Sequence, residues 1–351
     1  MRHGQRAWGV PPYNGDLFAV DGFAGARTLD EAAIADDALG PVLVALARDP
    51  DDPSIGVDFS GLEIGHLGHI YEGLLSLRLS LADRDYAYDP RADRYVAAGA
   101  DEAEVRRGEL LWLTDEGGRK GGGVYYTRTE LVRHLVRGAV GPAFDRHLAE
   151  VRRLADTDPA AAGVRLFDFH VLDPACGSAH FLVEVLDELA DKIAALVGEL
   201  PLPAVAEALD DLRRGAGPSF GAGVEDTALL KRLVLKRCVY GVDVSPMGAE
   251  IAKVSLWLAS FVPGLSLAYL DGNVQVGNSL IGVARPEEVA PPGDGGQVVM
   301  FGDDLSEAVR RAAEAAAKLR AIEDRTPDEV ERSRRAHASL RERVRGAKRV
   351  F

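Results

Sequence analysis

The sequence is poor in cysteine and has no long apolar run. Cys176 and Cys238 are the only cysteines among its 351 residues, so it carries neither a disulfide framework nor a zinc-binding set of thiolates. No uninterrupted apolar stretch approaches the roughly 20 residues needed to span a bilayer. The start from Met1 to Arg6 also leads into no signal-peptide core. We therefore expect a cytoplasmic protein that contacts no membrane.

Positive charge is scarce as well. Lys and Arg number 41 against 55 Asp and Glu, which gives a formal net charge of −14. This balance argues against coating of nucleic acid, because sequence-independent binding needs clustered cations. Arginines nevertheless gather from Arg332 to Arg349, in either the solvated face of a helix or an arm that contacts phosphates. Hydrophobic residues make up 47% of the chain, enough for one large domain or two medium ones.

The most informative stretch is an apolar run that ends in an acid. Phe167 to Leu172 has the β-branched and aromatic residues of a buried strand, which places Asp173 at the carboxyl end of that strand. Open α/β sheets bind their ligands at this end. The next residues, Pro174 to Ser178, form a thin turn that a ligand can approach closely. From Leu182 the apolar positions follow helical spacing.

Helix and strand patterns alternate after this turn. A helical stretch from Pro201 to Lys236 precedes a second strand from Cys238 to Asp243, and an apolar helix follows from Pro246 to Phe261. A third strand-like stretch runs through 265–270 and 274–276 and ends before Asn278. Strands that alternate with helices and end in polar residues indicate an α/β fold with a doubly wound sheet.

The N-terminal part differs from this core. Acidic helical patterns run from Asp30 to Ala47, a further helix is expected to continue through Leu81, and Tyr86 to Glu109 suggests a small stranded excursion. We therefore predict a mostly helical accessory domain at 1–115, the α/β core at 116–285, and a linker with a charged helical segment at 286–351.

The strand-end acids favour a cofactor that contains a nucleoside. A carboxylate such as Asp243 can accept from both hydroxyls of a ribose. Of the glycines in the dinucleotide fingerprint G-x-G-x-x-G, the turn has only Gly177, which disfavours a dehydrogenase. Upstream, Thr127-Arg128-Thr129-Glu130 is a capping-box pattern, and the free N–H groups of the helix that it begins favour an anion such as a carboxylate.

As an ordered set, these motifs resemble the cofactor-binding half of adenine-N6 DNA methyltransferases. The set is Tyr126-Thr127, Asp173-Pro174-Ala175-Cys176-Gly177-Ser178, Gly241-Val242-Asp243 and Gly277-Asn278-Ser279-Leu280. The chain is most similar to the large enzymes of combined restriction-modification and phage-exclusion systems, which carry segments resembling 10–15 and 66–75. The resemblance spans nearly the whole chain. It implies a Rossmann-like sheet that binds S-adenosylmethionine, and a function in host DNA modification or phage defence.

The resemblance also implies a role for each matching residue. Tyr126 and Thr127 would contact the methionine end of the cofactor, and Asp173, Ala175, Cys176 and Gly177 would pass under its amino acid and sulfonium. Asp243 would bind the ribose, and Asn278 would lie by the adenine, with Asp271 as the second choice. Two positions depart from the family: Ala179 stands where glycine is frequent, and Arg128 stands where proline is common.

One family motif is missing. These enzymes hold the flipped adenine in an Asn-Pro-Pro-Tyr type motif that follows the Gly-Asn-Ser-Leu segment. Nothing from Leu280 to Phe351 matches it, and Pro11-Pro12-Tyr13 lies upstream and follows Val10. We therefore predict a site-specific methyltransferase of double-stranded DNA with a flipped adenine, and no catalytic residue in this chain. Two alternatives stay open: a non-catalytic cofactor-binding subunit completed by a partner chain with the catalytic and target-recognition segments, and a methyltransferase of small molecules or RNA.

Two other clusters have ordinary interpretations. His66, His69 and Glu72 have metal-like helical spacing, but apolar residues interleave with them and favour a packing helix, so we predict no metal site. Cys176 lies near His180, yet no second residue is positioned as a base partner. A small side chain that lines the turn is favoured over a nucleophile.

Overall fold

The computed structural model describes most of the chain outside the N-terminal region. The described residues are 26–32, 34–49, 51–59, 77–91, 94–114, 127–218, 221–281 and 322–345, with single positions at 66, 68, 70, 314, 315 and 319. The chain forms two compact units, Leu62–Thr129 and the remainder, Met1–Gly61 with Glu130–Phe351. Within the described ranges, no helix combines the length and the apolar character that a membrane crossing requires.

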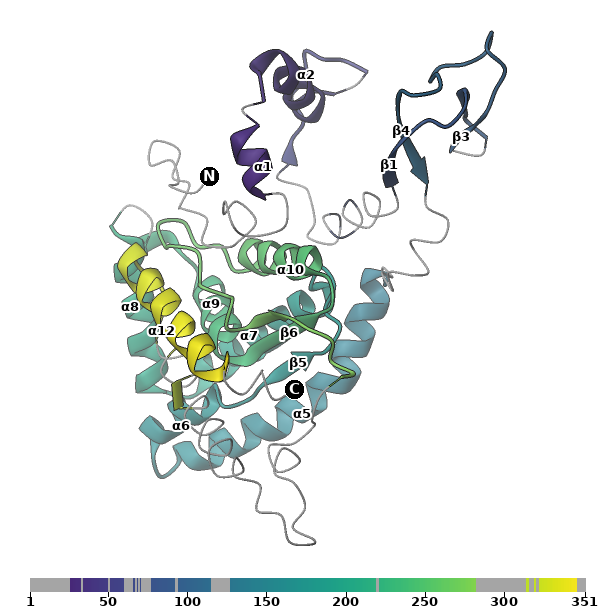
Figure 1. Ribbon diagram of the computed structural model, residues 1–351. Helices are drawn as coiled ribbons and strands as arrows, with labels where there is room; N and C mark the ends of the chain where they lie inside the picture. The colour runs from purple at the N-terminus through teal and green to yellow at the C-terminus, as the bar shows by residue number, and fades with distance from the viewer. Residues whose placement is uncertain are drawn as a thin grey trace, which may run out of the picture. The chain divides into compact units, whose positions relative to one another are not determined.

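The described residues of the smaller unit include two antiparallel strand pairs (Figure 1). Strand β1 (Leu77–Leu81) pairs with β4 (Leu110–Thr114), and β2 (Tyr86–Asp89) pairs with β3 (Arg94–Ala97). The stranded excursion predicted after Tyr86 is therefore confirmed. The helix predicted to continue through Leu81 is wrong at its end, because Leu-Arg-Leu-Ser-Leu alternates with the period of a strand.

Two short helices precede this unit in the chain. They are α1 (Ala26–Glu31) and α2 (Asp36–Ala47), and α2 carries two acids in its first turn. Acids at this position interact favourably with the helix dipole. The helical pattern predicted from Asp30 to Ala47 is thus confirmed, while the described part of residues 1–115 contains strands as well as helices.

The larger unit is mixed α/β and contains a parallel sheet. Its strands β5 (Val171–Asp173), β6 (Val239–Asp243) and β7 (Val274–Val276) are ordered β5-β6-β7. Helices α7 (His180–Glu199), α8 (Pro203–Ala216) and α9 (Asp226–Cys238) connect β5 to β6, and α10 (Pro246–Ala259) connects β6 to β7. The predicted alternation of strands and helices is present between residues 171 and 276.

The strands are shorter than predicted. Cys238 ends α9 instead of beginning β6, and residues 265–270 form no strand although most of them are buried. Side chains take over the backbone hydrogen bonds there: the Trp257 indole donates to the Ala268 carbonyl at 2.6 Å, and the Tyr269 amide donates to Asp324 at 2.8 Å. These bonds replace the ladder that a strand would need.

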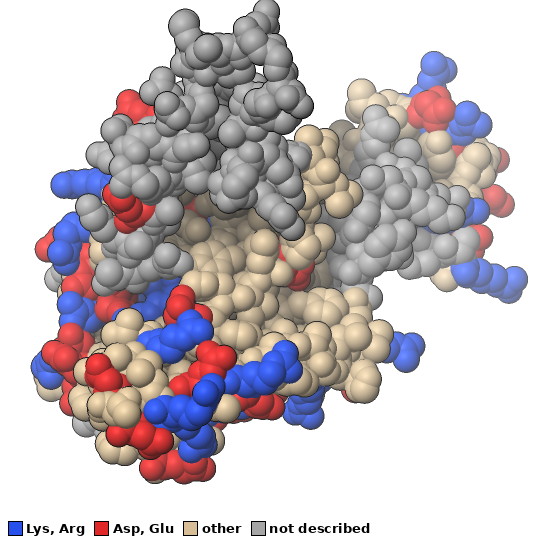
Figure 2. Space-filling view, turned by 90° about the horizontal axis from the view of Figure 1, so that it is seen from below, with Lys and Arg blue, Asp and Glu red and all other residues tan. Residues whose placement is uncertain are grey.

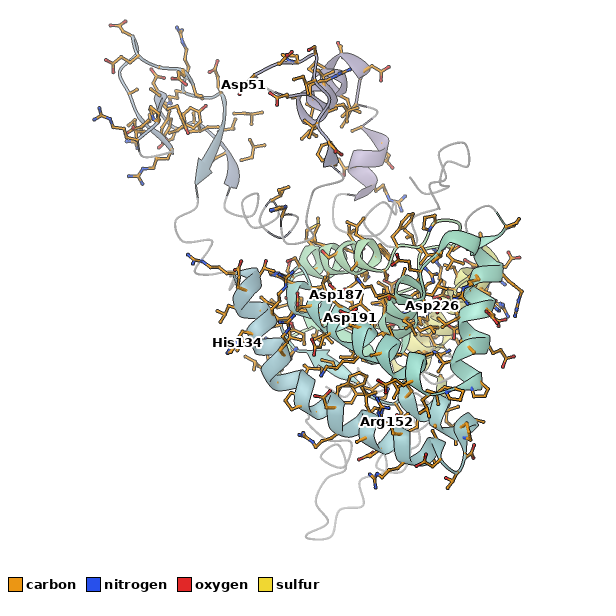
Figure 3. The ribbon with its side chains drawn as sticks, turned by 180° about the vertical axis from the view of Figure 1, so that it is seen from behind. Asp51, His134, Arg152, Asp187, Asp191 and Asp226 are labelled. Atoms are coloured by element: carbon orange, nitrogen blue, oxygen red, sulfur yellow. The ribbon has the colours of Figure 1, made fainter. Side chains whose placement is uncertain are left out.

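Long helices pack beside the sheet. Helix α5 (Thr129–Ala155) begins at the capping-box pattern, as predicted, and α6 (Pro159–Leu166) follows it. Helix α7 buries the apolar stripe expected from its spacing, including Leu186 and Ile193, which are completely buried. Figure 3 shows α5 and α7 from behind, with Asp187 on α7, whose carboxylate lies 2.7 Å from Lys231 of α9.

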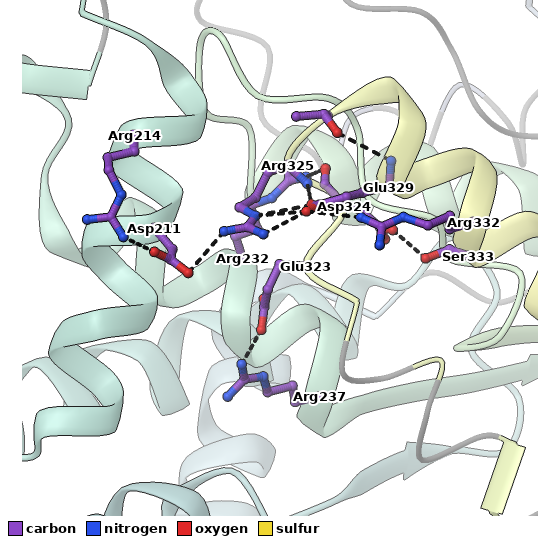
Figure 4. Close-up of polar contacts among 11 residues, drawn as sticks. Asp211, Arg214, Arg232, Arg237, Glu323, Asp324, Arg325, Glu329, Arg332 and Ser333 are labelled. Carbon is purple, nitrogen blue, oxygen red and sulfur yellow. Dashed lines mark hydrogen bonds and ion pairs between the residues drawn. The ribbon is translucent and has the colours of Figure 1, made fainter.

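Helix α12 (Pro327–Arg345) is attached to this core through a buried carboxylate (Figure 4). Asp324 is fully buried and accepts from the Ser333 hydroxyl at 2.5 Å and from the ammonium of Lys236. Its carbonyl accepts from Arg232 at 2.8 Å. The paired cation and these hydrogen bonds offset the cost of burying the charge. The charged helical segment predicted near the C-terminus is therefore a docked helix over these residues.

Charged side chains of both signs are interspersed on the surface. On the described part of the face in Figure 2, no broad area is blue alone. Several arginines have acidic neighbours: on α12, Arg334 and Arg335 lie 3.4 Å and 3.1 Å from carboxylate oxygens of Glu331. For these described arginines, the pairing favours the solvated helix face over the phosphate-contacting arm.

Candidate functional site

The turn after β5 is tied to β6 by its own backbone. Asp173 is the last residue of β5, and its Oδ1 accepts from the Ala175 amide at 3.0 Å. The Cys176 amide donates to the Val242 carbonyl at 2.9 Å, and the Gly177 amide donates to Asp243 Oδ2 at 2.8 Å. Three successive amides of the turn therefore bond to acceptors within the protein.

This use of the amides distinguishes the turn from a phosphate-binding loop. Loops that cradle phosphates direct successive backbone N–H groups at the ligand. Here the N–H groups of Ala175, Cys176 and Gly177 point at protein oxygens instead. The geometry agrees with the missing dinucleotide fingerprint, and it leaves recognition of a ligand mainly to side chains and carbonyls.

Asp243 connects two loops of the site. Its Oδ2 accepts from Gly177 in the first turn, and its Oδ1 accepts from the Ser245 amide at 2.8 Å in the loop after β6. A carboxylate oxygen can accept two hydrogen bonds. The carboxylate of Asp243 therefore retains acceptor capacity for hydroxyl groups of a ligand while it fixes both loops.

Gly248 belongs to this site although the sequence analysis did not single it out. A Cβ at this position would lie 2.9 Å from Asp243 Oδ1, so only glycine lets α10 approach the carboxylate this closely. The Gly248 amide also bonds to the Ser245 hydroxyl at 3.1 Å, which caps α10. Ser245 followed by Pro246 was the available signal, since this pair is typical of a helix start.

Gly241 allows β6 to approach the turn. A Cβ on this residue would lie 2.9 Å from Cys176 Sγ and 3.0 Å from Leu182 Cδ1. Cys176 is buried, and this burial, with the nearby carboxylates of Asp173 and Asp243, raises the pKa of its thiol to about 12. A thiol with this pKa stays protonated at neutral pH and is a poor nucleophile. The side chain fills space beneath the turn.

The turn also contains left-handed backbone. Gly177 has φ of 51°, and Ala179 has φ of 69°. In the described ranges, Asp324 is the only other residue besides glycines with positive φ. A left-handed conformation costs an ordinary L-residue roughly 1–2 kcal/mol. Position 179, where the resemblance indicated glycine, is therefore held in a conformation that glycine adopts without strain.

Two carboxylates make the site electrostatically negative. Burial, together with repulsion from Asp243, raises the pKa of Asp173 above its ordinary value, against the opposing effect of its bond from the Ala175 amide. A neighbouring carboxylate disfavours the ionised form of Asp173. A ligand that brings positive charge close to Asp173 would relieve this repulsion.

Asn278 and Asp271 differ in their surroundings. Asn278 follows β7, and its Oδ1 accepts from the Leu280 amide at 3.0 Å in a local turn. Asp271 forms an ion pair with the buried Lys253, which also lies 2.5 Å from Glu250. Since Asp271 is committed to this pair, Asn278 stays the preferred residue for the third position of the site.

The other candidate residues fall in the smaller unit or outside the described residues. Thr127 falls in the smaller unit, and Tyr126 lies outside the described residues, as do Pro11-Pro12-Tyr13, His69 and Glu72. Within the part of the chain that the structure describes, no three His, Cys, Asp or Glu side chains are grouped so that they could hold a metal ion.

The sequence has a relative among curated proteins. In an alignment 206 residues long that covers 50% of this chain, it is 27% identical to a protein of Methanocaldococcus jannaschii named "Putative type II restriction enzyme and methyltransferase". The matched stretch covers 16% of that protein, so this chain spans a small part of its length. No protein-family profile matches the sequence. No solved structure matches it either.

Proposed function

We propose that this chain is the cofactor-binding part of an S-adenosylmethionine-dependent methyltransferase of a restriction-modification or phage-defence system. Asp243 carries the proposal, because its carboxylate lies at the carboxyl end of a parallel strand and bridges the turn after β5 and the loop after β6. This is where α/β sheets bind nucleosides. The similarity to a protein named as a restriction enzyme and methyltransferase supports the same class.

The donor set fits S-adenosylmethionine better than a dinucleotide. The ribose offers two hydroxyls that Asp243 can accept, and the sulfonium carries a positive charge that suits a pair of carboxylates. The amides of the turn are engaged within the protein, which suits a cofactor without a pyrophosphate. In this proposal Asn278 lies beside the adenine, and Tyr126 and Thr127 contact the methionine end.

The proposed substrate is the exocyclic amine of an adenine flipped out of double-stranded DNA. When bound, S-adenosylmethionine supplies a methyl group activated by its sulfonium. The residues of this chain hold and orient the cofactor, and proximity and electrostatics lower the barrier without a covalent enzyme intermediate. We assign the protein to the cytoplasm, where its DNA substrate lies.

A second candidate function is a non-catalytic subunit completed by a partner chain. It takes account of one observation: residues 280–351 contain no Asn-Pro-Pro-Tyr type motif. In that case this chain binds cofactor but transfers no methyl group by itself. Incubating the purified chain with labelled cofactor and duplex DNA distinguishes the two functions, because methylated adenine would appear only if the chain is catalytically complete.

Calorimetric titration with S-adenosylmethionine tests the cofactor assignment. Asp243→Ala is expected to weaken binding at least about tenfold, since hydrogen bonds to a charged acceptor contribute roughly 1.5–3 kcal/mol. Asp210→Ala is the matched control, because this exposed carboxylate on α8 pairs only locally with Arg213. Equal affinities for wild type and Asp243→Ala, or no binding by either, would refute the assignment.

A further inference from the structure

A cavity of about 870 Å³ opens at the amino edge of the parallel sheet. Its lining includes Asp168 and His170, which precede β5, and Arg237, which precedes β6. Asp243 ends β6, and a strand of five residues spans roughly 13 Å. The cavity is therefore separate from the candidate cofactor site, and its volume lies within the roughly 300–1,000 Å³ of small-molecule sites.

Part of the lining is apolar and comes from three helices. Leu154 of α5, Val164 of α6 and Ala204 of α8 contribute to it, and Val164 is 72% exposed. Helices α6 and α8 approach each other closely here, since a Cβ on Gly163 would lie 3.0 Å from the Ala204 Cβ. Because closely packed elements deform little, this part of the lining offers a firm apolar surface to the body of a ligand.

Arg237 supplies a positive charge that is held in place. Its Cζ lies 4.8 Å from the centroid of the Phe167 ring, and its Nη2 donates to Glu323 (Figure 4). Because the cation–π contact and the ion pair fix the guanidinium, a ligand that binds it sacrifices little side-chain entropy. The side chain is 27% exposed, and among the described residues it has no second acceptor. Its Nε and Nη1 groups are therefore available to a ligand.

Arg165 adds a second guanidinium to the lining. Its Nη1 donates to Asp168 Oδ2 at 2.5 Å, and its Nη2 donates to Glu150 Oε2 at 3.3 Å. Among the described lining residues both arginines are present but only one acid, Asp168, since Glu150 and Glu323 lie outside the lining. The cavity thus meets more positive than negative groups directly. Because three carboxylates already pair with the two guanidiniums, a monoanion suits this charge balance better than a phosphate dianion.

We propose that this cavity binds a small carboxylic acid with an apolar body. Nε and Nη1 of Arg237 donate to the two carboxylate oxygens, in the forked geometry that guanidinium and carboxylate groups share. The body of the ligand lies against Leu154, Val164 and Ala204. A cation would meet two guanidiniums, and a neutral apolar molecule would make no hydrogen bond with Arg237. The site uses none of the residues assigned to the cofactor, so this inference does not depend on the proposed function.

Three probes with the same phenyl ring test the preference for a carboxylate. Phenylacetate is the probe, and phenylacetamide and phenethylamine are its neutral and cationic counterparts. In ligand-detected NMR titrations we expect phenylacetate to bind with a dissociation constant of about a millimolar, as its size implies. The amide and the amine should bind at least about tenfold more weakly, because they lose the charge-assisted hydrogen bonds. Equal binding of all three probes, or no binding of phenylacetate, would overturn the proposal.

Charge substitutions at the exposed Val164 locate the binding without disturbing the core. Val164→Glu should weaken phenylacetate binding about two- to fivefold, and Val164→Lys should strengthen it by a similar factor, because each adds a charge beside the bound carboxylate. Leu131→Glu and Leu131→Lys are matched controls. Leu131 is 50% exposed near the start of α5, whose 27 residues span roughly 40 Å, whereas Leu154 lies near its end. If the affinity changes equally at both positions, or at neither, the cavity is not the binding site.

Substitution of Arg237 tests the group that carries the recognition. Arg237→Gln should weaken phenylacetate binding at least about tenfold, and Arg237→Lys, which keeps the charge but lacks the fork, should restore only part of the affinity. Arg237 also pairs with Glu323, so the unfolding free energy of each variant is measured as well. A folded Arg237→Gln variant that binds phenylacetate like wild type would overturn the proposal. If this variant does not fold, the Val164 substitutions decide the question.

Discussion

Replacing Gly241 by alanine tests the close approach between β6 and the turn. The added Cβ would lie 2.9 Å from Cys176 Sγ, 3.0 Å from Leu182 Cδ1 and 3.2 Å from Cys176 Cβ. Optimal separations between such atoms are about 3.5–4 Å, so the turn or α7 must shift. Overpacking of this kind costs about 1–3 kcal/mol. Alanine also restricts the unfolded chain, which stabilises the protein by about 0.4–1 kcal/mol. We expect a net loss of about 1–2 kcal/mol.

Urea unfolding followed by circular dichroism measures this loss. Gly138→Ala in α5 is the control, because no atom lies within 4 Å of the Cβ that it would add. Since alanine is favoured over glycine inside a helix, this variant should gain about 0.5–1 kcal/mol. The two substitutions are chemically identical and are expected to change stability in opposite directions.

A double substitution identifies the atom responsible. Cys176→Ala removes the sulfur that lies closest to the new methyl group, so Gly241→Ala should cost less in that background, with a coupling energy of at least about 0.5 kcal/mol. If Gly241→Ala leaves the unfolding free energy unchanged, or if its cost is the same with and without the sulfur, the argument for close packing beneath the turn is wrong.

Three further predictions concern the site and α12. Gly248→Ala should weaken S-adenosylmethionine binding about tenfold in calorimetry, because the new methyl group would displace the Asp243 carboxylate. The control Gly198→Ala adds a methyl group to open space on α7 and should leave the affinity unchanged. The Cys176 thiol should resist a thiol reagent at about pH 8 in the folded protein and react after unfolding, since its pKa is about 12. Rapid labelling of Cys176 in the folded protein would contradict its burial. Burial lowers the pKa of His337 below its ordinary 6.5. The folded state therefore binds fewer protons than the unfolded state, and the free energy of unfolding decreases as the pH falls from 6.5 toward the lower pKa of the folded state. If the urea midpoint of His337→Gln declines equally over this pH range, this histidine is excluded as the cause.

The local features of the core were predictable from short-range patterns. The stripe that includes Leu182, Leu186 and Ile193 predicted α7, because one helical face had to be buried. Gly177 predicted a tight turn, and the structure gives it a left-handed φ. The end of β1 shows the limit of such patterns: the leucines at 77 and 81 also satisfy the i, i+4 spacing of a helix, and strand pairing with β4 decides between the two.

The long-range contacts were not predictable in the same way. Asp324 pairs with Lys236, which is 88 residues away, and accepts from the Tyr269 amide, which is 55 residues away. With 55 acidic and 41 basic side chains in the sequence, charge alone cannot select one partner. The selection follows from the position of α12, which is fixed by the apolar contacts among Tyr269, Leu319 and Val330. Gly248 escaped the sequence analysis for a different reason: it lies only five residues from Asp243, and its contact with that carboxylate depends on how α10 begins.

The geometry at Asp243 also explains why this position requires a carboxylate. Both of its oxygens accept from backbone amides, at Gly177 and Ser245. An asparagine has one acceptor oxygen and would turn its NH₂ group toward the second amide, so one donor would lose its partner at a cost of about 1–3 kcal/mol. The loops alone therefore demand aspartate, independently of any ligand. A loss of cofactor affinity in an Asp243 variant has to be compared with its unfolding free energy, because ribose binding predicts a loss of affinity that persists when the variant is fully folded.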